Sequence, residues 1–201
     1  MSCISYYELD IIINNIMIYI VTENKKKFLS GKKWLNPFNI KVSQKELDII
    51  EPQSEDIQSI TKSKATQAFT ILHKPVLVTD AGVSIPALKG FPGPFMHYIT
   101  KWLTVEDLLN LTKDKKDRSI IFENVIAYKD RKHVKVFSAK REGVLLKTPK
   151  GEGIPLDQIL TFRDDLKTVA QCDVLGESRF GKELTDSIWT QFGTWYKASI
   201  P

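Results

Sequence analysis

A cluster of polar side chains follows the first strongly apolar run of this sequence. The run is Met17–Val21, and after it come a hydroxyl at Thr22, an amide at Asn24 and three consecutive lysines ending at Lys27. In open α/β sheets ligands bind beyond the carboxyl ends of strands, and the free N–H groups at a helix start favour anions. The pattern is therefore consistent with a phosphate site. The alternative, which spacing alone favours, is a helix N-cap followed by solvated lysines.

Carboxylates occur at two further places. Asp80 follows a second apolar run, Pro75–Thr79, and precedes Ala81 and Gly82, whereas Glu51 stands before a proline. A carboxylate at a strand end can bind a metal or orient water, although an Asx-turn that closes the strand is an equally good interpretation. Mg²⁺ typically takes one or two carboxylates and completes its shell with water and phosphate. Glu51 and Asp80 facing the lysines would therefore form a magnesium–phosphate site.

Hydrophobic periodicity predicts alternating strands and helices in the first half of the chain. The expected elements are a strand at 17–21, a helix from Lys25 limited by Gly31 and Pro37, an extended segment at 40–44, a helix at 54–72 with Ser54 as its N-cap, and a strand at 75–79. Residues 90–95, Gly-Phe-Pro-Gly-Pro-Phe, are dense in turn formers. They indicate a rigid loop or, as the sharper alternative, a substrate-binding loop.

The second half of the chain shows the alternation that is typical of antiparallel strands. Its expected elements are a helix at 104–111 with a capping box of Thr104 and Asp107, strands at 119–128 and 133–139, a bulge or turn at 141–143, and a final helix at 182–197. Continuous apolar strands such as 17–21 are instead typical of parallel sheets. We therefore predict an α/β fold with a mixed β-sheet flanked by helices.

Composition favours one globular domain. The 201 residues are 42% hydrophobic and 26% charged, which excludes disordered and collagen-like chains. We expect an N-terminal extension at 1–16 and a single domain at 17–201. The apolar run near 11–21 is too short to cross a membrane and lacks the features of a signal peptide. Two distant cysteines, Cys3 and Cys172, indicate no disulfide framework, so a cytoplasmic location is expected.

The net charge of +5 is unevenly distributed. Residues 101–150 hold thirteen basic and seven acidic side chains, whereas 151–201 hold five and eight. A basic stretch with Phe122, Tyr128 and Phe137 could indicate a nucleic-acid-binding module, because such modules interleave aromatic and basic groups on a sheet. The aromatics fit strand cores equally well, and charge alone is first a solubility feature. A nucleic-acid partner is therefore the less favoured hypothesis.

The order of these residues resembles that of the inosine triphosphate pyrophosphatase family, enzymes that remove noncanonical purine nucleoside triphosphates. The resemblance runs from residue 17 to about 98. The matching stretches are Thr22, Asn24 and Lys27 for a T-x-N-x-x-K phosphate motif, Glu51 for an acidic position, Lys64, Ala65 and Ala68 for K-A-x-x-A, Val76–Gly82 for a strand with an acidic-Asp-Thr-Gly turn, and Ala87–Phe95 for a loop with a G-x-P-G-P core. Thr79 and Ala81 replace that turn's acidic residue and threonine.

The resemblance implies an Mg²⁺-dependent hydrolase that cleaves a nucleoside triphosphate to the monophosphate and pyrophosphate. It implies catalytic roles for Asp80, Lys27 and Lys64, and a metal site at Glu51 and Asp80. The implied nucleotide-binding residues are Thr22, Asn24, Lys27, Thr79, Gly82 and Asp157. The family fold is an elongated mixed sheet in two lobes, the second at about 100–160, with the nucleotide cleft between them, and the usual assembly is a homodimer.

The resemblance weakens in the last third of the chain. Family members read the base with a G-F-G-[YW]-D-P segment, but only Gly153 and Asp157 match here and both aromatic positions are aliphatic. A lysine and a Ser-His-Arg triplet should follow; counting from Ala170 places Glu177 at the lysine and residues 181–183 at the triplet. The alternative hypothesis is therefore a weakly active or inactive nucleotide-binding homologue with altered base specificity. The preferred base and sugar stay open.

Overall fold

The computed structural model describes residues 16–180 and 187–199. Its strands are β1 (Ile18–Val21), β2 (Val42–Lys45), β3 (Val76–Ser84), β4 (Pro92–Gly93), β5 (Ser119–Lys129), β6 (Val134–Leu145) and β7 (Leu160–Thr161). Its α-helices are α2 (Lys25–Leu35), α3 (Ile57–Leu72), α4 (Met96–Trp102), α5 (Val105–Thr112), α6 (Val169–Leu175) and α7 (Ile188–Ser199). Short 3₁₀ helices are η1 (Asn36–Phe38), η2 (Pro86–Leu88) and η3 (Leu156–Gln158).

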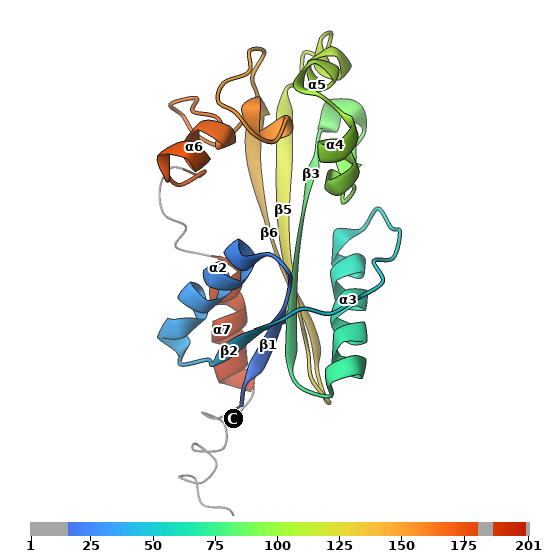
Figure 1. Ribbon diagram of the computed structural model, residues 1–201, viewed down its shortest axis with the longest axis vertical. Helices are drawn as coiled ribbons and strands as arrows, with labels where there is room; N and C mark the ends of the chain where they lie inside the picture. The colour runs from blue at the N-terminus through green and yellow to red at the C-terminus, as the bar shows by residue number, and fades with distance from the viewer. Residues whose placement is uncertain (1–15, 181–186, 200–201) are drawn as a thin grey trace, which may run out of the picture. The chain divides into compact units, whose positions relative to one another are not determined.

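The seven described strands form one mixed sheet (Figure 1). Their order is β2-β1-β3-β5-β6-β7, with β4 paired to β3. The strand pairs β1–β2 and β1–β3 are parallel, whereas β3–β4 and β6–β7 are antiparallel. This arrangement confirms the predicted α/β class with a mixed sheet flanked by helices. No helix within the described part of the chain is both long and apolar enough to cross a bilayer.

The chain folds into two compact units. The first contains the described parts of residues 1–80, 125–138 and 186–201, and the second those of 81–124 and 139–185. The expected N-terminal extension, apart from residue 16, lies outside the described residues. The final helix was predicted at 182–197; its described counterpart is α7, and residues 182–186 also lie outside the described part.

In the first unit, helices cover both faces of the sheet. Figure 1 shows α2 and α7 on one side of β1 and α3 on the other. Successive strand residues point to opposite faces, so β1 supplies Val21 to the α3 side and Ile20 to the α2–α7 side. Ala65 and Ala68 of α3 are fully buried against the sheet. The small alanines let the helix lie close to the strands and hold the polar residues of α3 in a fixed position.

Helix α2 runs through Gly31, and the prediction that this glycine limits the helix was wrong. Gly31 is buried, and a Cβ built there would lie 2.8 Å from side-chain atoms of both Ile20 and Trp189. Glycine is therefore required by the close approach of α2 to β1 and α7. The helix ends at Leu35 instead, and Pro37 follows within η1.

Helix α3 begins later than predicted. The N-cap is Asp56, whose side chain accepts a hydrogen bond from the Gln58 N–H at 3.0 Å, and not Ser54. Ser54 lies before the helix, where its hydroxyl accepts from the Asp56 N–H at 3.1 Å. Sequence alone could not separate these residues because serine and aspartate are comparable N-caps.

Strand β3 is longer than predicted and contains Asp80 in its interior. The predicted strand ended at Thr79, with Asp80, Ala81 and Gly82 as a closing turn, whereas β3 continues to Ser84. Its parallel pairing with β1 covers Val76 to Val78. Further along, β3 pairs antiparallel with β4 through Val83 and Ser84. Asp80 therefore lies just beyond the parallel part of the strand, and the Asx-turn interpretation was wrong.

The second unit has its own apolar core, which includes Val83, Ile120, Leu145 and Leu160. Helix α5 begins with the predicted capping box, in which Asp107 N–H donates to Thr104 and the Asp107 carboxylate accepts from Thr104 N–H. The alternative of a turn at 141–143 was wrong, because β6 continues through these residues to Leu145. A Cβ at Gly143 would lie 2.6 Å from the Thr161 carbonyl, so glycine serves close strand packing there.

The Gly90–Phe95 segment is fixed to the end of β3. It contains β4, the buried Pro92 and a cis peptide bond between Phe91 and Pro92. The pairing of Pro92 and Gly93 with Ser84 and Val83 supports the rigid-loop interpretation. His97, which follows this segment, is an exposed residue of α4.

Candidate active site

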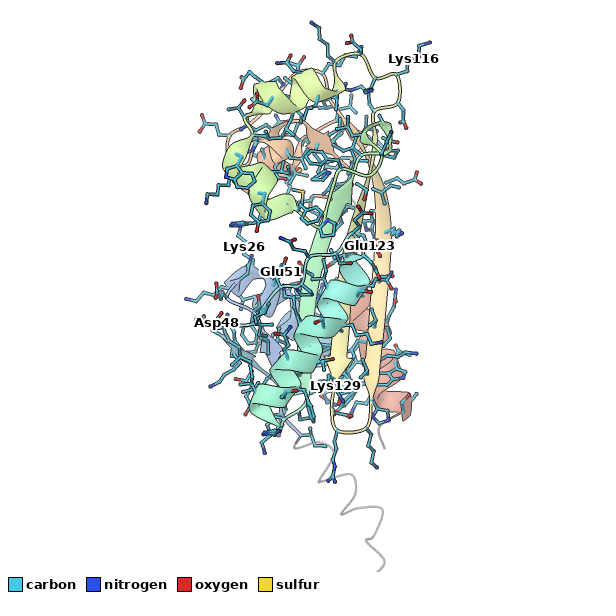
Figure 2. All side chains as sticks on the ribbon, turned by 90° about the vertical axis from the view of Figure 1, so that its right-hand side faces the viewer. Lys26, Asp48, Glu51, Lys116, Glu123 and Lys129 are labelled. Atoms are coloured by element: carbon cyan, nitrogen blue, oxygen red, sulfur yellow. The ribbon has the colours of Figure 1, made fainter. Side chains whose placement is uncertain are left out.

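Two carboxylates of the first unit converge on one lysine. Lys64, on α3, donates from Nζ to Glu51 Oε2 at 2.6 Å and to Asp80 Oδ2 at 2.9 Å. Glu51 comes from the segment between β2 and α3 (Figure 2), and Asp80 from β3. The side chains of Lys64 and Asp80 are each 19% exposed, whereas that of Glu51 is 56% exposed. The cluster thus has a shielded side and a side open to solvent.

A second lysine approaches the same carboxylate. Lys27, on the first turn of α2, places Nζ 3.9 Å from Asp80 Oδ1 and donates to the Thr79 carbonyl oxygen at 3.4 Å. Thr79 itself is buried in β3. The structure therefore brings together Lys27, Lys64, Glu51 and Asp80, four residues that lie on separate segments of the sequence.

The segment between β1 and α2 is ordered by its own side chains. Thr22 Oγ1 accepts from the Asn24 N–H at 3.1 Å, and Asn24 Oδ1 accepts from the N–H groups of Lys26 and Lys27 at 2.9 and 3.2 Å. Asn24 is therefore the N-cap of α2, as the structural alternative predicted. A hydroxyl that accepts one bond keeps its proton to donate, and an amide that accepts through oxygen keeps its NH₂ group. Capping thus leaves both residues able to donate to an anion.

The two lysines differ in their electrostatics. Burial lowers the pKa of Lys27 from the usual lysine value, and the charge of Asp80 only partly opposes this. Burial also acts on Lys64, but there the charge of Asp80 and the hydrogen bonds to Glu51 and Asp80 outweigh it and raise the pKa. Lys64 is therefore held as an ammonium ion between two carboxylates, while Lys27 is the more weakly compensated cation.

The carboxylates of the cluster suit a hard divalent cation that takes its remaining ligands from water and phosphate. No group of three or more His, Cys, Asp or Glu side chains that could hold a metal was found among residues 16–180 and 187–199. Glu51 and Asp80 nevertheless offer carboxylate oxygens that share one Lys64 ammonium. Mg²⁺ is commonly bound by one or two carboxylates together with water and substrate phosphates. The residues present therefore fit Mg²⁺ that arrives with a phosphate ligand.

Two predicted nucleotide-binding residues, Gly82 and Asp157, belong to the second unit. Asp157 lies in η3, and its pKa is raised because burial disfavours the carboxylate; the charge of Arg179 opposes this and that of Asp173 adds to it. Arg179 donates to both carboxylate oxygens of Asp173.

Glu177, which occupies the position expected for a lysine, accepts from Lys167 Nζ at 2.8 and 2.9 Å. Residues 181–183, counted as the place of the missing triplet, lie outside the described residues.

Sequence reasoning missed one polar contact to the candidate phosphate-binding segment, Thr22–Lys27. Gln44 of β2 donates from Nε2 to the Thr22 carbonyl oxygen at 2.9 Å. A signal was available, because Gln44 is a polar residue in the extended segment that pairs with β1. Its partner could not be inferred without the strand register, which places Gln44 opposite Ile20.

Fold and site together define an α/β protein with carboxylates and lysines gathered beside the carboxyl end of its parallel strands. Residues 18–179 match the model of the Ham1 family, and the chain belongs to that family. This confirms the resemblance to inosine triphosphate pyrophosphatases drawn from the motifs.

Two similar proteins from different organisms share the name dITP/XTP pyrophosphatase. A dITP/XTP pyrophosphatase of Hyperthermus butylicus is 32% identical over 165 residues, which cover 82% of this chain and 87% of that protein. A dITP/XTP pyrophosphatase of Saccharolobus solfataricus is 28% identical over 166 residues, covering 82% and 86%. The solved structure of a HAM1 protein from Coxiella burnetii superposes on this chain with a TM-score of 0.74. The match covers 92% of this chain and all of that one at 21% sequence identity, and it shows that the two share a fold.

Proposed function

We infer that this chain is a nucleoside triphosphate pyrophosphohydrolase that acts on noncanonical purine nucleotides such as dITP and XTP. Membership of the Ham1 family and relatives named dITP/XTP pyrophosphatases over four fifths of the chain support this activity. The products are a nucleoside monophosphate and pyrophosphate. The single observation on the molecule that carries the proposal is the convergence of Lys27, Lys64, Glu51 and Asp80.

The residue roles follow from the charge that the reaction must handle. A water oxygen attacks the α-phosphorus, the bond from that phosphorus to the bridging oxygen breaks, and pyrophosphate leaves. Asp80 orients the water and accepts its proton. Lys27 and Lys64 neutralise charge on the phosphates, and Thr22 and Asn24 donate hydrogen bonds to them. Fixed cations and donors aimed at developing charge are among the largest contributions to catalysis.

We propose Mg²⁺ as the cofactor and assign Glu51 and Asp80 as the residues that would hold it. A bound Mg²⁺ would offset phosphate charge and lower the pKa of a coordinated water. Because Lys64 contacts the same two carboxylates, its ammonium group keeps their charges compensated.

The proposal is tested by Asp80→Asn and Glu51→Gln, which remove charge with little change of shape. We expect each to lower kcat for pyrophosphate release by about 100-fold or more, the usual size of the loss of one charge-stabilising group. The matched control is Asp48→Asn, an exposed acidic residue of the same segment (Figure 2). The assay uses Mg²⁺ with the triphosphates of inosine, xanthosine and the standard bases. Full activity in both site variants would refute the assignment.

A second candidate is a nucleotide-binding protein with little turnover. It is favoured by Glu177, which stands where the family has a lysine and is paired with Lys167. Calorimetry with Mg²⁺ and the same triphosphates, run beside the release assay, separates the two. Binding without pyrophosphate release would favour this candidate.

We further propose that the protein is a homodimer in the cytoplasm, as the family resemblance implies. Multi-angle light scattering tests the assembly, and a mass of one chain at micromolar concentration would contradict it. A nucleic-acid partner has little support. Tyr128 is fully buried, Phe122 packs on an apolar core, and Phe137 contacts the rings of Phe192 and Trp195.

A further inference from the structure

The backbone of Thr22 is held by β2 at both its N–H group and its carbonyl oxygen. Its N–H donates to the Lys45 carbonyl at 3.0 Å, which continues the parallel pairing of β1 with β2. Its carbonyl oxygen accepts from the side chain of Gln44 at 2.9 Å, in a partly buried contact. The paired register ends at Val21 and Lys45, so the Gln44 amide extends the hold of β2 one residue beyond the ladder.

A chain of hydrogen bonds leads from this point to the lysines. Thr22 Oγ1 accepts from the Asn24 N–H, and Asn24 Oδ1 accepts from the N–H groups of Lys26 and Lys27. Lys27 then reaches the Thr79 carbonyl and Asp80. The position of Thr22 thus sets where α2 starts, and the start of α2 sets where Lys27 Nζ lies.

We propose that Gln44 is a positioning residue that fixes the Thr22–Lys27 segment in the geometry that receives the triphosphate. The inference rests on the proposed function, and it assigns to that site a residue that touches neither substrate nor metal. Its physical basis is preorganisation. A segment already ordered in the free protein does not lose conformational freedom when the phosphates bind, whereas a loosened segment must be ordered at the expense of binding free energy.

The expected kinetic signature follows from that argument. Bound phosphates would themselves order a loosened segment, so the cost of losing Gln44 falls on the binding step and much less on chemistry. We expect Gln44→Leu, which keeps the approximate size and removes the donor, to raise KM about 10-fold while kcat changes less than about threefold. The dissociation constant of inorganic tripolyphosphate, measured by calorimetry with Mg²⁺, should rise by the same factor as KM.

Ser43→Ala is the matched control, because Ser43 is the adjacent β2 residue and pairs with Tyr19 of β1. It should leave KM, kcat and the tripolyphosphate constant unchanged. Gln44→Met provides a second donor-free variant of similar length if Gln44→Leu does not fold. Unchanged KM and tripolyphosphate affinity in a folded Gln44 variant would overturn the inference, as would a loss confined to kcat. Failure of the unaltered protein to bind tripolyphosphate or cleave any triphosphate would instead refute the proposed function.

Discussion

Lys27 and Lys64 lie in the same site, but their surroundings shift their pKa values in opposite directions. Both approach Asp80, but Lys64 donates to two carboxylates at short distance, whereas Lys27 Nζ lies 3.9 Å from Asp80 Oδ1. Burial lowers the pKa of Lys27, and in Lys64 the two carboxylates overcome burial and raise it. The Lys27 ammonium is therefore less well neutralised by carboxylates than that of Lys64, which suits a group that receives phosphate.

Asp157 offers a residue-level test through pH. Because burial raises its folded pKa above the ordinary value of 3.8, the proton bound to Asp157 stabilises the fold fully below about pH 3.8. That contribution is lost as pH rises through the folded pKa, and above it the buried carboxylate is unfavourable. Asp157→Asn cannot ionise, so we expect it to increase the free energy of urea unfolding at pH 7 and to have a smaller effect near pH 3.8.

The control for Asp157→Asn is Asp164→Asn, at an exposed position of the same unit. If Asp157 also binds the nucleotide, as the motif resemblance implies, the variant should raise KM while it stabilises the protein, the trade-off often seen at functional positions. Equal or lower stability than the unaltered protein at pH 7 would contradict the argument.

The residues of the site could be predicted from sequence where they lie next to an apolar run or within a family motif. Lys27 and Asp80 each follow an apolar run, and Glu51 was identified as a second carboxylate before a proline, whereas Lys64 was placed by the family resemblance. The contacts among them could not be deduced, because Lys64 bridges carboxylates that are 13 and 16 residues away on separate segments. The Gln44 contact likewise depends on strand register, which single-sequence patterns leave open.

At the scale of elements, β3 shows why a strand end can be misread. Ala81 and Gly82 looked like turn formers, and glycine commonly is one. In the structure the strand continues to Ser84, with β5 beside it in the sheet and the short β4 paired to its end. These pairings depend on segments that follow β3 in the chain, so the local sequence could not reveal them. The consequence for the site is that Asp80 projects from a paired strand and not from a free turn.

Helix α2 provides the element-level prediction. Gly31→Ala would place a methyl group 2.8 Å from Ile20 and Trp189 side-chain atoms, so these side chains or the elements that carry them must shift. Overpacking of a well-packed core typically costs about 1–3 kcal/mol, and we expect a loss of that size in the free energy of urea unfolding. Since α2 carries Lys27, KM should rise as well.

Ser30→Ala, at the neighbouring exposed position of α2, controls for the change in helix propensity. Alanine is the better helix former, so this variant should be neutral or slightly stabilising. The packing argument would be wrong if Gly31→Ala were as stable as Ser30→Ala.

At the scale of the whole chain, the hydrophobic pattern predicted the fold class, whereas the charge distribution did not identify a partner. The basic stretch at 101–150 includes Arg118, which donates to three backbone carbonyls and so has a structural role. Three aromatic residues of that stretch, Phe122, Tyr128 and Phe137, pack against apolar or aromatic side chains. The α/β class followed from periodicity because burial imposes it on every element, whereas a partner requires surface chemistry that net charge does not specify.

Ligand-linked unfolding tests the site through the stability of the whole protein. A ligand that binds only the folded chain stabilises it by about 2.7 kcal/mol at 100 times its dissociation constant. For a protein of this size each kcal/mol corresponds to roughly 2–4 °C, so an α,β-methylene analogue of dITP with Mg²⁺ should raise Tm by roughly 5–10 °C. Deoxyinosine at the same concentration should give little shift, because we propose that the lysine–carboxylate cluster recognises phosphate and metal. The Glu51→Gln, Asp80→Asn double variant should lose the Mg²⁺-dependent part of the rise. An equal rise with deoxyinosine would show that recognition lies in the base, and the assignment of Lys27, Lys64, Glu51 and Asp80 to the phosphates would fall.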